Sequence, residues 1–215
     1  MVGNKPAERI QSMARPRTFD ESMVLTAAVE AFWTHGYEGT STRDLVKATG
    51  LNQPSLYNAF GDKRSLYRRS LDHYLECSVR ERIQRLEGLP HSGMAITRFF
   101  AELVDRTLND PLHRGCLLVN SAIEARADDA DLRQAVVDEL QTIRSFFEGR
   151  LVALSTQRDA AGGIDAKAGA NHLLSVLLGV RVLARVNPDP AWVTDAIGIA
   201  LNSLGLPALA LCDIH

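Results

Sequence analysis

The sequence has few cysteines and few aromatic residues, and both shortages exclude some kinds of site. Its 215 residues include 3 Cys, and aromatic residues make up only 6% of the chain. Cys77, Cys116 and Cys212 show neither CxxC nor metal-ligand spacing, which argues against a disulfide framework and a structural zinc site. We therefore expect no cofactor and no metal site.

The signals of secreted proteins, membrane proteins and common enzymes are also missing. No cationic stretch followed by an apolar run and a cleavage site opens the chain, and no uninterrupted apolar segment reaches the roughly 20 residues that span a bilayer. GxSxG, HExxH, P-loop and dinucleotide motifs are absent, as is strand-like alternation. We expect a cytoplasmic all-α protein that has no membrane partner and is not an enzyme, with an all-α enzyme as the weaker alternative.

Net charge is small, but its distribution is uneven. The chain carries a formal charge of −2, with 11 Lys+Arg against 9 Asp+Glu in residues 1–80 and 13 against 17 in the rest. Clustered cations suit local contacts with phosphate groups, although a solvated helix face is the default interpretation of any one cluster alone. The clusters are Arg15/Arg17, Arg43/Lys47 and Lys63/Arg64/Arg68/Arg69.

Capping signals predict three short helices near the N-terminus. Asp20 caps the first, which should end at Gly36, and the Ser41–Asp44 capping box opens the second, which should end at Gly50. Asn52 caps the third, with Pro54 tolerated in its first turn and Gly61 at its end. The expected inward-facing residues of the second and third helices are Leu45, Val46, Ala48, Leu56 and Phe60.

A longer helix should follow Asp62, because apolar residues recur at helical spacing from Tyr67 to Leu86. Further helical segments are expected at about 93–108, 116–126, 129–157, 166–186 and 190–204. This pattern predicts a flexible arm of residues 1–18, a three-helix domain of residues 19–65 and a larger helical domain of residues 66–215.

The third helix is short and exposes polar side chains, which needs a reason. The second helix of a helix-turn-helix pair enters the major groove of DNA with its N-terminal residues against base edges. Gln53 can pair with adenine, Arg43 with guanine, and Pro54 and Ser55 can meet a thymine methyl group. Phosphate contacts would come from Tyr57, Lys63 and the amides near Thr42.

The run "RDLVKATGLNQPSLYNAFGDKRSLY", preceded by "AFWTHGYEGTST", resembles the DNA-binding domain of TetR-family transcriptional regulators over residues 19–75. The resemblance implies a homodimer on a near-palindromic double-stranded DNA operator, with a body that binds a small molecule. By position, the residues that match the family's DNA-facing set are Arg43, Gln53, Pro54, Ser55, Tyr57, Asn58 and Lys63. Arg15 and Arg17 of the arm are candidates for a minor-groove contact, with disorder as the alternative for residues 1–14.

The C-terminal third of the chain is strongly apolar. Residues 166–186 are apolar almost all round, and a helix of this kind must be covered on every side. The resemblance implies that the last two helices pack against their symmetry mates as a four-helix bundle, and a plain intramolecular core is the alternative.

The segment "PLHRGCLLVNSAIEA" contains a candidate sensor. Cys116 follows His113, Arg114 and Gly115 at an expected helix N-terminus, where a thiolate is favoured. Some TetR-family repressors with a similar GCLL segment sense electrophiles or oxidants through that cysteine, and a buried packing role is the alternative. Candidates for a ligand pocket are Phe99, Leu103, Asn120, Phe147 and His172.

We therefore expect a TetR-type transcriptional regulator, a repressor that a small-molecule or electrophilic effector releases from its operator. The alternative is a DNA-binding protein without an effector.

Overall fold

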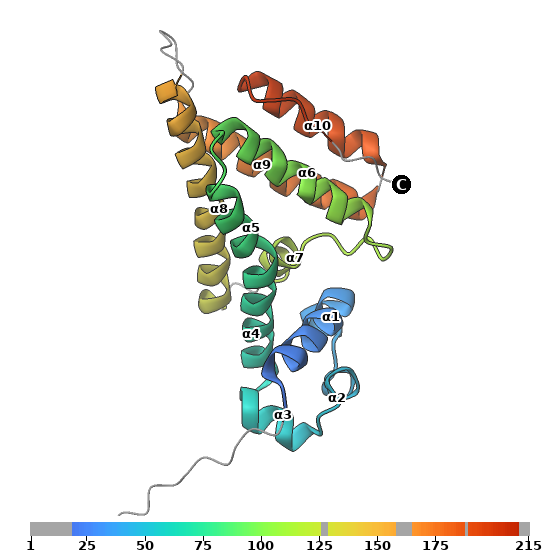
Figure 1. The fold of residues 1–215 in the computed structure, drawn as a ribbon. Coiled ribbons are helices and arrows are strands. Elements are labelled where there is room, and N and C mark those ends of the chain that lie inside the picture. The colour runs from blue at the N-terminus through green and yellow to red at the C-terminus, as the bar shows by residue number, and fades with distance from the viewer. Residues whose placement is uncertain (1–18, 126–128, 158–164, 188, 211–215) are drawn as a thin grey trace, which may run out of the picture.

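The computed structural model describes residues 19–125, 129–157, 165–187 and 189–210, and within these ranges the chain forms helices and no strand (Figure 1). The all-α prediction is confirmed. The predicted arm, with Arg15 and Arg17, lies outside the described residues, as does Cys212. The helices are α1 Glu21–Gly39, α2 Thr42–Thr49, α3 Gln53–Phe60, α4 Lys63–Leu75, the π-helical η1 Glu76–Arg80, α5 Glu81–Glu87, α6 Ser92–Leu108, α7 Leu117–Glu124, α8 Ala130–Gln157, α9 Ala166–Val186 and α10 Pro190–Ser203.

Helices α1 to α3 form a compact unit that we call the head. The Asp20 carboxylate caps α1 as predicted, since it accepts hydrogen bonds from the amides of Ser22 and Met23 at 2.9 and 3.3 Å. The predicted stop at Gly36 is confirmed for the first helical segment of α1. Gly36 adopts φ +72° and ψ 170°, outside the helical region, and a second short segment follows the kink and reaches Gly39. A glycine accepts this left-handed φ without the steric cost that a Cβ brings, so one residue redirects the chain.

The capping predictions for α2 and α3 are confirmed. Ser41 and Asp44 form a reciprocal capping box, and the Asn52 side chain accepts the amide of Ser55 at 2.9 Å. The inward face of α2 is narrower than expected. Leu45 is fully buried, whereas Val46 is half-buried and Ala48 is exposed, because two turns of helix place only about one residue per turn against the core.

A long helix made of α4, η1 and α5 connects the head with the rest of the protein, and we call it the connector (Lys63–Glu87). The predicted apolar stripe is confirmed, since Tyr67, Leu71, Leu75, Val79, Ile83 and Leu86 are all buried. The π-helical turn was not predicted. In an α-helix of 3.6 residues per turn, side chains spaced four residues apart shift by about 40° around the helix axis at each step. The wider π-helical turn of η1 offsets this shift and keeps the apolar stripe on one side.

Helices α6 to α10 form the body. Its centre is an aromatic cluster in which the rings of Phe99 and Phe147 lie 5.2 Å apart and those of Phe100 and Phe147 stack at 5.6 Å. By length and composition α9 could cross a membrane, with a mean hydropathy of 1.2 over its most apolar window. Because α9 packs between α8 and α10, with 39% of this window buried, we interpret it as a helix of the body.

Candidate nucleic-acid interface

The N-terminal half of α3 presents a polar surface on an apolar base. Leu56 and Phe60 are 0% and 4% exposed and fasten the helix to the head, while the predicted contact residues on its other face are exposed. These exposed residues are Gln53, Pro54, Ser55 and Asn58. Rigid packing on one side and free hydrogen-bonding groups on the other allow α3 to meet a polar partner without rearrangement.

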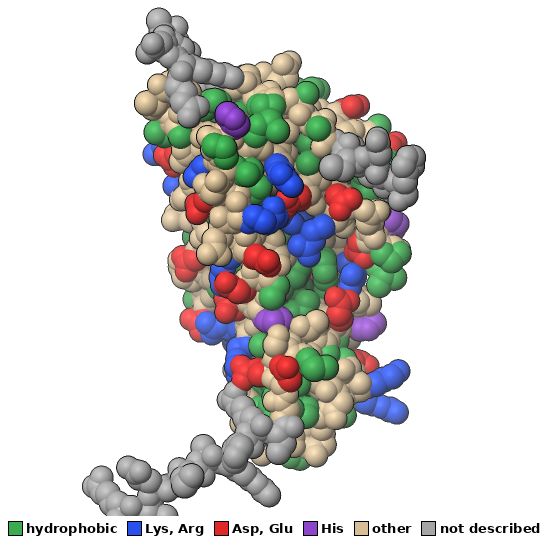
Figure 2. Space-filling view, in the orientation of Figure 1, with side chains coloured by type: hydrophobic (Ala, Val, Ile, Leu, Met, Phe, Trp, Pro, Cys, Tyr) green, Lys and Arg blue, Asp and Glu red, His purple; other side chains and the backbone are tan. Residues whose placement is uncertain are grey.

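The predicted contact residues of α2 lie next to this surface. The hydroxyl oxygens of Thr42 and Tyr57 are 2.7 Å apart, so a hydrogen bond joins the start of α2 to the middle of α3. Arg43 is exposed. Figure 2 shows basic side chains that project from the edge of the head, on the side where Figure 1 places α2. The structure thus brings both helices of the predicted pair to one end of the head.

The predicted cation cluster at the start of the connector does not act as a unit. Arg64 pairs with Asp129 at 2.5 Å, Arg68 pairs with Asp131 at 3.0 Å, and Arg69 pairs with Glu21. The Lys63 ammonium lies 4.5 Å from the centre of the Tyr37 ring. The prediction that all four cations suit phosphate contacts is therefore too broad, because the three arginines join the connector to other helices.

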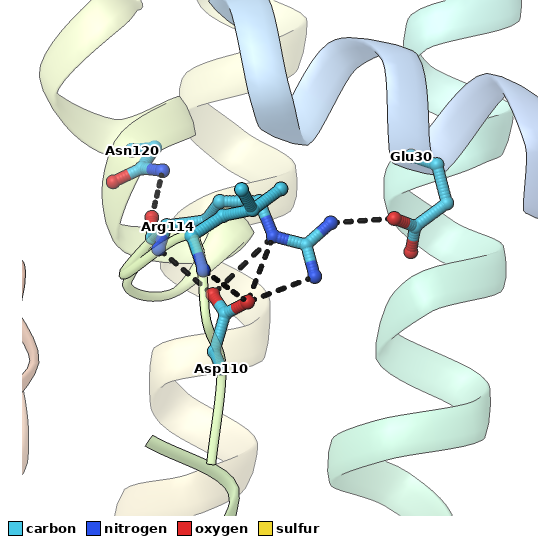
Figure 3. Close-up of polar contacts among 5 residues, drawn as sticks. Glu30, Asp110, Arg114 and Asn120 are labelled. Carbon is cyan, nitrogen blue, oxygen red and sulfur yellow. Dashed lines mark hydrogen bonds and ion pairs between the residues drawn. The ribbon is translucent and has the colours of Figure 1, made fainter. Parts of the chain in front are cut away.

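The head and the body meet at Arg114, in the loop between α6 and α7. Its guanidinium lies between the carboxylates of Asp110 and Glu30, at 3.2 and 2.5 Å, as Figure 3 shows. It also lies 4.2 Å from the Trp33 ring centre, and its carbonyl accepts the Asn120 side chain at 3.0 Å. Arg114 therefore ties the body to α1 of the head.

Helix α7 adds one further tie to the head, through Glu124, and one to the connector, through Ser121. The Glu124 carboxylate accepts the Tyr37 amide at 2.8 Å, and a Cβ built on Gly36 would stand 2.8 Å from Glu124 Oε1. The hydroxyl oxygens of Tyr67 and Ser121 are 2.7 Å apart, and burial raises the pKa of Tyr67 to about 12. Sequence reasoning missed Glu124, since no local pattern places a carboxylate against an amide 87 residues away.

Cys116 occupies the N-cap position of α7, where its side chain makes no capping hydrogen bond, and it is only 7% exposed. The Tyr74 hydroxyl donates a hydrogen bond to its sulfur at 3.8 Å, and burial raises the pKa of Tyr74 well above its usual value. The position at a helix N-terminus agrees with the prediction, whereas the burial favours the packing alternative. Cys77, the other described cysteine, is exposed on η1.

The predicted pocket residues do not form one site. Phe99, Leu103 and Phe147 are packed inside the body with exposures of 1% or less. Asn120 is buried and bridges the Arg114 carbonyl to Arg185, whose guanidinium donates to Asn120 Oδ1 at 2.7 Å. His172 is exposed on α9 and faces away from this core. Two hollows in the described surface have linings that include none of these residues or Cys116.

Helices α9 and α10 leave an apolar face uncovered. Large apolar side chains there are 37 to 81% exposed, and a Cβ on Gly179 or Gly198 would meet no atom within 4 Å. The exposed apolar residues of this face are Val182, Leu183, Val186, Trp192 and Ile199. Contiguous exposure of this kind is typical of a surface that a partner covers.

Among the described residues, no group of three or more His, Cys, Asp or Glu side chains is arranged to hold a metal ion.

Two family models match the chain. The model for bacterial regulatory proteins of the tetR family matches residues 24–69, which include α2 and α3. The model for a tetracyclin repressor-like C-terminal domain matches residues 94–199, in the body.

Whole-chain relatives agree with these matches. The chain is 31% identical over 193 residues to the uncharacterized HTH-type transcriptional regulator YezE of Bacillus subtilis, covering 89% of this chain and all of the relative. It is 29% identical over 197 residues to the HTH-type transcriptional repressor ComR of Escherichia coli, covering 89% and 92%. A solved structure of a cysteine mutant of the TetR-family regulator CifR with a 26-bp operator superimposes with a TM-score of 0.77 at 32% identity, covering 88% and 99%.

Proposed function

Because the chain belongs to the tetR family of bacterial regulatory proteins, a family of DNA-binding transcriptional regulators, we propose that it is a repressor that binds a near-palindromic operator as a homodimer. An effector that binds the body would release it. The observation that carries the proposal is the rigid, exposed polar surface of α3, supported by the operator complex of the similar CifR chain.

In this proposal α3 lies in the major groove and reads base edges. Gln53 has the two hydrogen-bonding groups that adenine requires, and Pro54 and Ser55 are small enough to meet a thymine methyl group. Arg43 would reach guanine from α2, and Asn58 lies one turn along α3 from Ser55, on its exposed side. Thr42, Tyr57 and Lys63 would hold phosphates at the edge of the groove, which sets the register of the helix.

The uncovered face of α9 and α10 is the proposed dimer interface. Two copies of this face would bury Val182, Val186 and Ile199 of each chain, and the open space over Gly179 allows two helices to approach closely. A dimer would hold two copies of α3 about one helical turn of DNA apart, roughly 34 Å. The symmetry of the operator then follows from the symmetry of the protein.

The effector would act through the connector and the ties between head and body. A ligand shifts an equilibrium only by its different affinity for the two states. The contacts of Arg114 with Glu30 and of Glu124 with Tyr37 fix the head to the body. An effector that binds more tightly to the state in which these contacts are broken would change the separation of the two heads. Cys116 is the candidate for a thiol-reactive effector, because a group added to this buried side chain would displace the start of α7.

Footprinting of the purified protein on the DNA upstream of its own gene tests the proposal. We expect the wild type to protect a near-palindromic segment. A double variant with Arg43→Ala and Gln53→Ala should lose that protection. A protein that protects no segment of this DNA, and that binds random duplexes with equal affinity, would contradict the role of a specific regulator.

The same footprint with peroxide or an electrophile tests the thiol alternative. If Cys116 is the sensor, treatment removes protection in the wild type and leaves it in Cys116→Ser, whereas Cys77→Ser behaves as the wild type. Protection that survives treatment in all three proteins would assign Cys116 to packing and leave a non-covalent effector.

A further inference from the structure

A groove of about 730 Å³ lies between α1 of the head, the connector and α8 of the body. Small-molecule sites typically have volumes of about 300–1,000 Å³. We propose that this groove binds a small organic cation, an amine or amidine with an apolar body, and that this occupant is an effector. The second part rests on the repressor function proposed above.

Two ion pairs join the connector to the N-terminal half of α8 along the groove. Arg68 reaches Asp131 at 3.0 Å, and farther along the connector Arg80 reaches Glu139 at 3.0 Å. Figure 1 shows α4 and α8 side by side over this length. The apolar floor between the ion pairs includes Leu71 and Leu132, which are 2% and 6% exposed. Such a floor suits the hydrocarbon part of a ligand.

The lining carries more negative than positive charge. It contains three arginines, and two of them already have acidic partners on the groove wall, since Arg69 pairs with Glu21 and Arg80 pairs with Asp72 and Glu76 as well as Glu139. The third, Arg68, pairs with Asp131, which lies outside the lining. The carboxylates of the lining are Glu21, Asp72, Glu76, Asp138 and Glu139. This excess of carboxylates favours a cation over an anion.

Glu139 supplies the specific contact. Its side chain is 2% exposed, Oε2 accepts from Arg80, and Oε1 is buried with no hydrogen-bond partner among the described residues. A buried acceptor without a donor is costly, so a ligand N–H at Oε1 would stabilise the bound state. Burial raises the pKa of Glu139 above its ordinary value even beside Arg80, and a bound cation would favour the charged carboxylate.

The position of the groove explains how a bound ligand can affect the DNA-binding surface. One wall belongs to the head through Glu21 and Leu25, another to the connector, and the third to α8 of the body. Arg80 lies in the π-helical turn η1, and irregular turns of this kind are frequent at functional sites. A cation at Oε1 shares the charge of the Glu139 carboxylate with Arg80 at Oε2, which weakens the ion pair between the connector and α8. It would therefore alter the angle between the head and the body.

Calorimetry of the full chain without DNA tests the site. The probes are benzamidinium and phenethylammonium, with benzamide and phenethyl alcohol as neutral analogues of similar shape. We expect each cation to bind with one site per chain and the neutral analogues to bind about tenfold more weakly or not at all, because a charged hydrogen bond is lost. Equal binding of charged and neutral probes, or no saturable binding of either cation, would overturn the proposal.

Variants of α8 locate the site. Glu139→Gln keeps the shape and should weaken cation binding about tenfold or more, whereas Glu148→Gln, on the same helix and paired with Arg144, should leave it unchanged. Ala135→Phe should block the groove without changing its charge. Wild-type cation affinity in both Glu139→Gln and Ala135→Phe would place the cation elsewhere and refute the site.

Operator binding is measured separately, without any cation and then with it. Cation binding without operator binding would refute the repressor function and keep the site, whereas operator binding without cation binding would refute only the site. Release of the operator by the cation in the wild type but not in Glu139→Gln would support both. A cation that binds and leaves the operator complex intact would refute the effector role.

Discussion

The exposed faces of α3 and α9 show how differently two uncovered helix surfaces of one chain can be built. The eight residues of α3 place two apolar side chains in the head and turn amide, hydroxyl and proline groups outward. The 21 residues of α9 also bury one side, but the opposite side carries Val182, Leu183 and Val186 next to small residues. Both faces are open, and their chemistry is opposite.

The contrast indicates that exposure by itself does not identify a partner. A face rich in hydrogen-bonding groups loses little by staying hydrated, so it can meet water and base edges alternately. An apolar face is unfavourable in water at about 25 cal/mol per Å² and needs a permanent cover. The α3 surface therefore suits reversible contact with DNA, and the α9–α10 face suits a lasting contact with a second copy of the chain. The first three of the four predictions below test this division.

The largest effect should come from a charge in the apolar face. Val182→Glu would bury an unpaired carboxylate in the proposed dimer interface, which costs several kcal/mol. We expect monomers in sedimentation velocity and an operator affinity that falls by about a hundredfold or more, because ~3 kcal/mol corresponds to that factor. Val137→Glu is the matched control, since Val137 is similarly exposed, at 47% against 42%, but lies on α8. A dimeric Val182→Glu variant would remove the distinction between the two faces.

A smaller loss is expected from the polar face. Gln53→Ala should cost about 1–3 kcal/mol of operator affinity and relax the preference for one base pair in each half-site. Binding to a set of operators with single substitutions measures both changes. Gln141→Ala, at an exposed position on α8, should change neither. If Gln53→Ala leaves affinity and base preference intact, α3 does not read bases.

Lys63→Ala should weaken binding to all operator sequences alike. Lys63 lies at the start of the connector beside Tyr37, where a phosphate contact carries no sequence information. The slope of log affinity against log salt should fall by about one unit. Lys167→Ala, an exposed lysine at the start of α9, serves as the control. A change of base preference in Lys63→Ala would mean that this lysine takes part in readout.

The smallest effect concerns stability and involves neither face. Burial raises the pKa of Glu139 above its ordinary value of 4.5, so the folded state holds this proton more tightly than the unfolded chain does. This contribution to stability is present below the ordinary pKa and is lost as the pH rises through the raised one. Glu139→Gln should therefore show a weaker fall of the denaturation midpoint across that range than the wild type. Glu148→Gln should follow the wild type, and parallel curves for all three would contradict the shift.

Much of the fold and part of the candidate site could be predicted from local patterns. Caps at Asp20, Ser41 and Asn52 act within four residues of the chain, so the start of each helix was predicted correctly. The exposure of Gln53, Pro54 and Ser55 follows from the positions of Leu56 and Phe60 one turn away. The roles of these residues toward DNA remain predictions.

Contacts between distant segments could not be predicted. Arg114 pairs with a residue 84 positions earlier, and Arg64, Arg68 and Arg69 turned out to join helices instead of forming a free basic cluster. We predicted that His172 lines a pocket because it interrupts an apolar run, but the packing of α9 directs its side chain outward. Such pairings depend on which helix faces meet, and sequence spacing carries no information about that.

By itself, then, the sequence determined the helices, their caps and the polar surface of α3, because these depend on backbone hydrogen bonds and side-chain periodicity within a few residues. Only the tertiary structure decided which faces stay open, where the ion pairs join the head to the body, and that a groove with a buried carboxylate lies between them. These features arise when helices far apart in the chain pack together, since burial and pairing depend on neighbours in space.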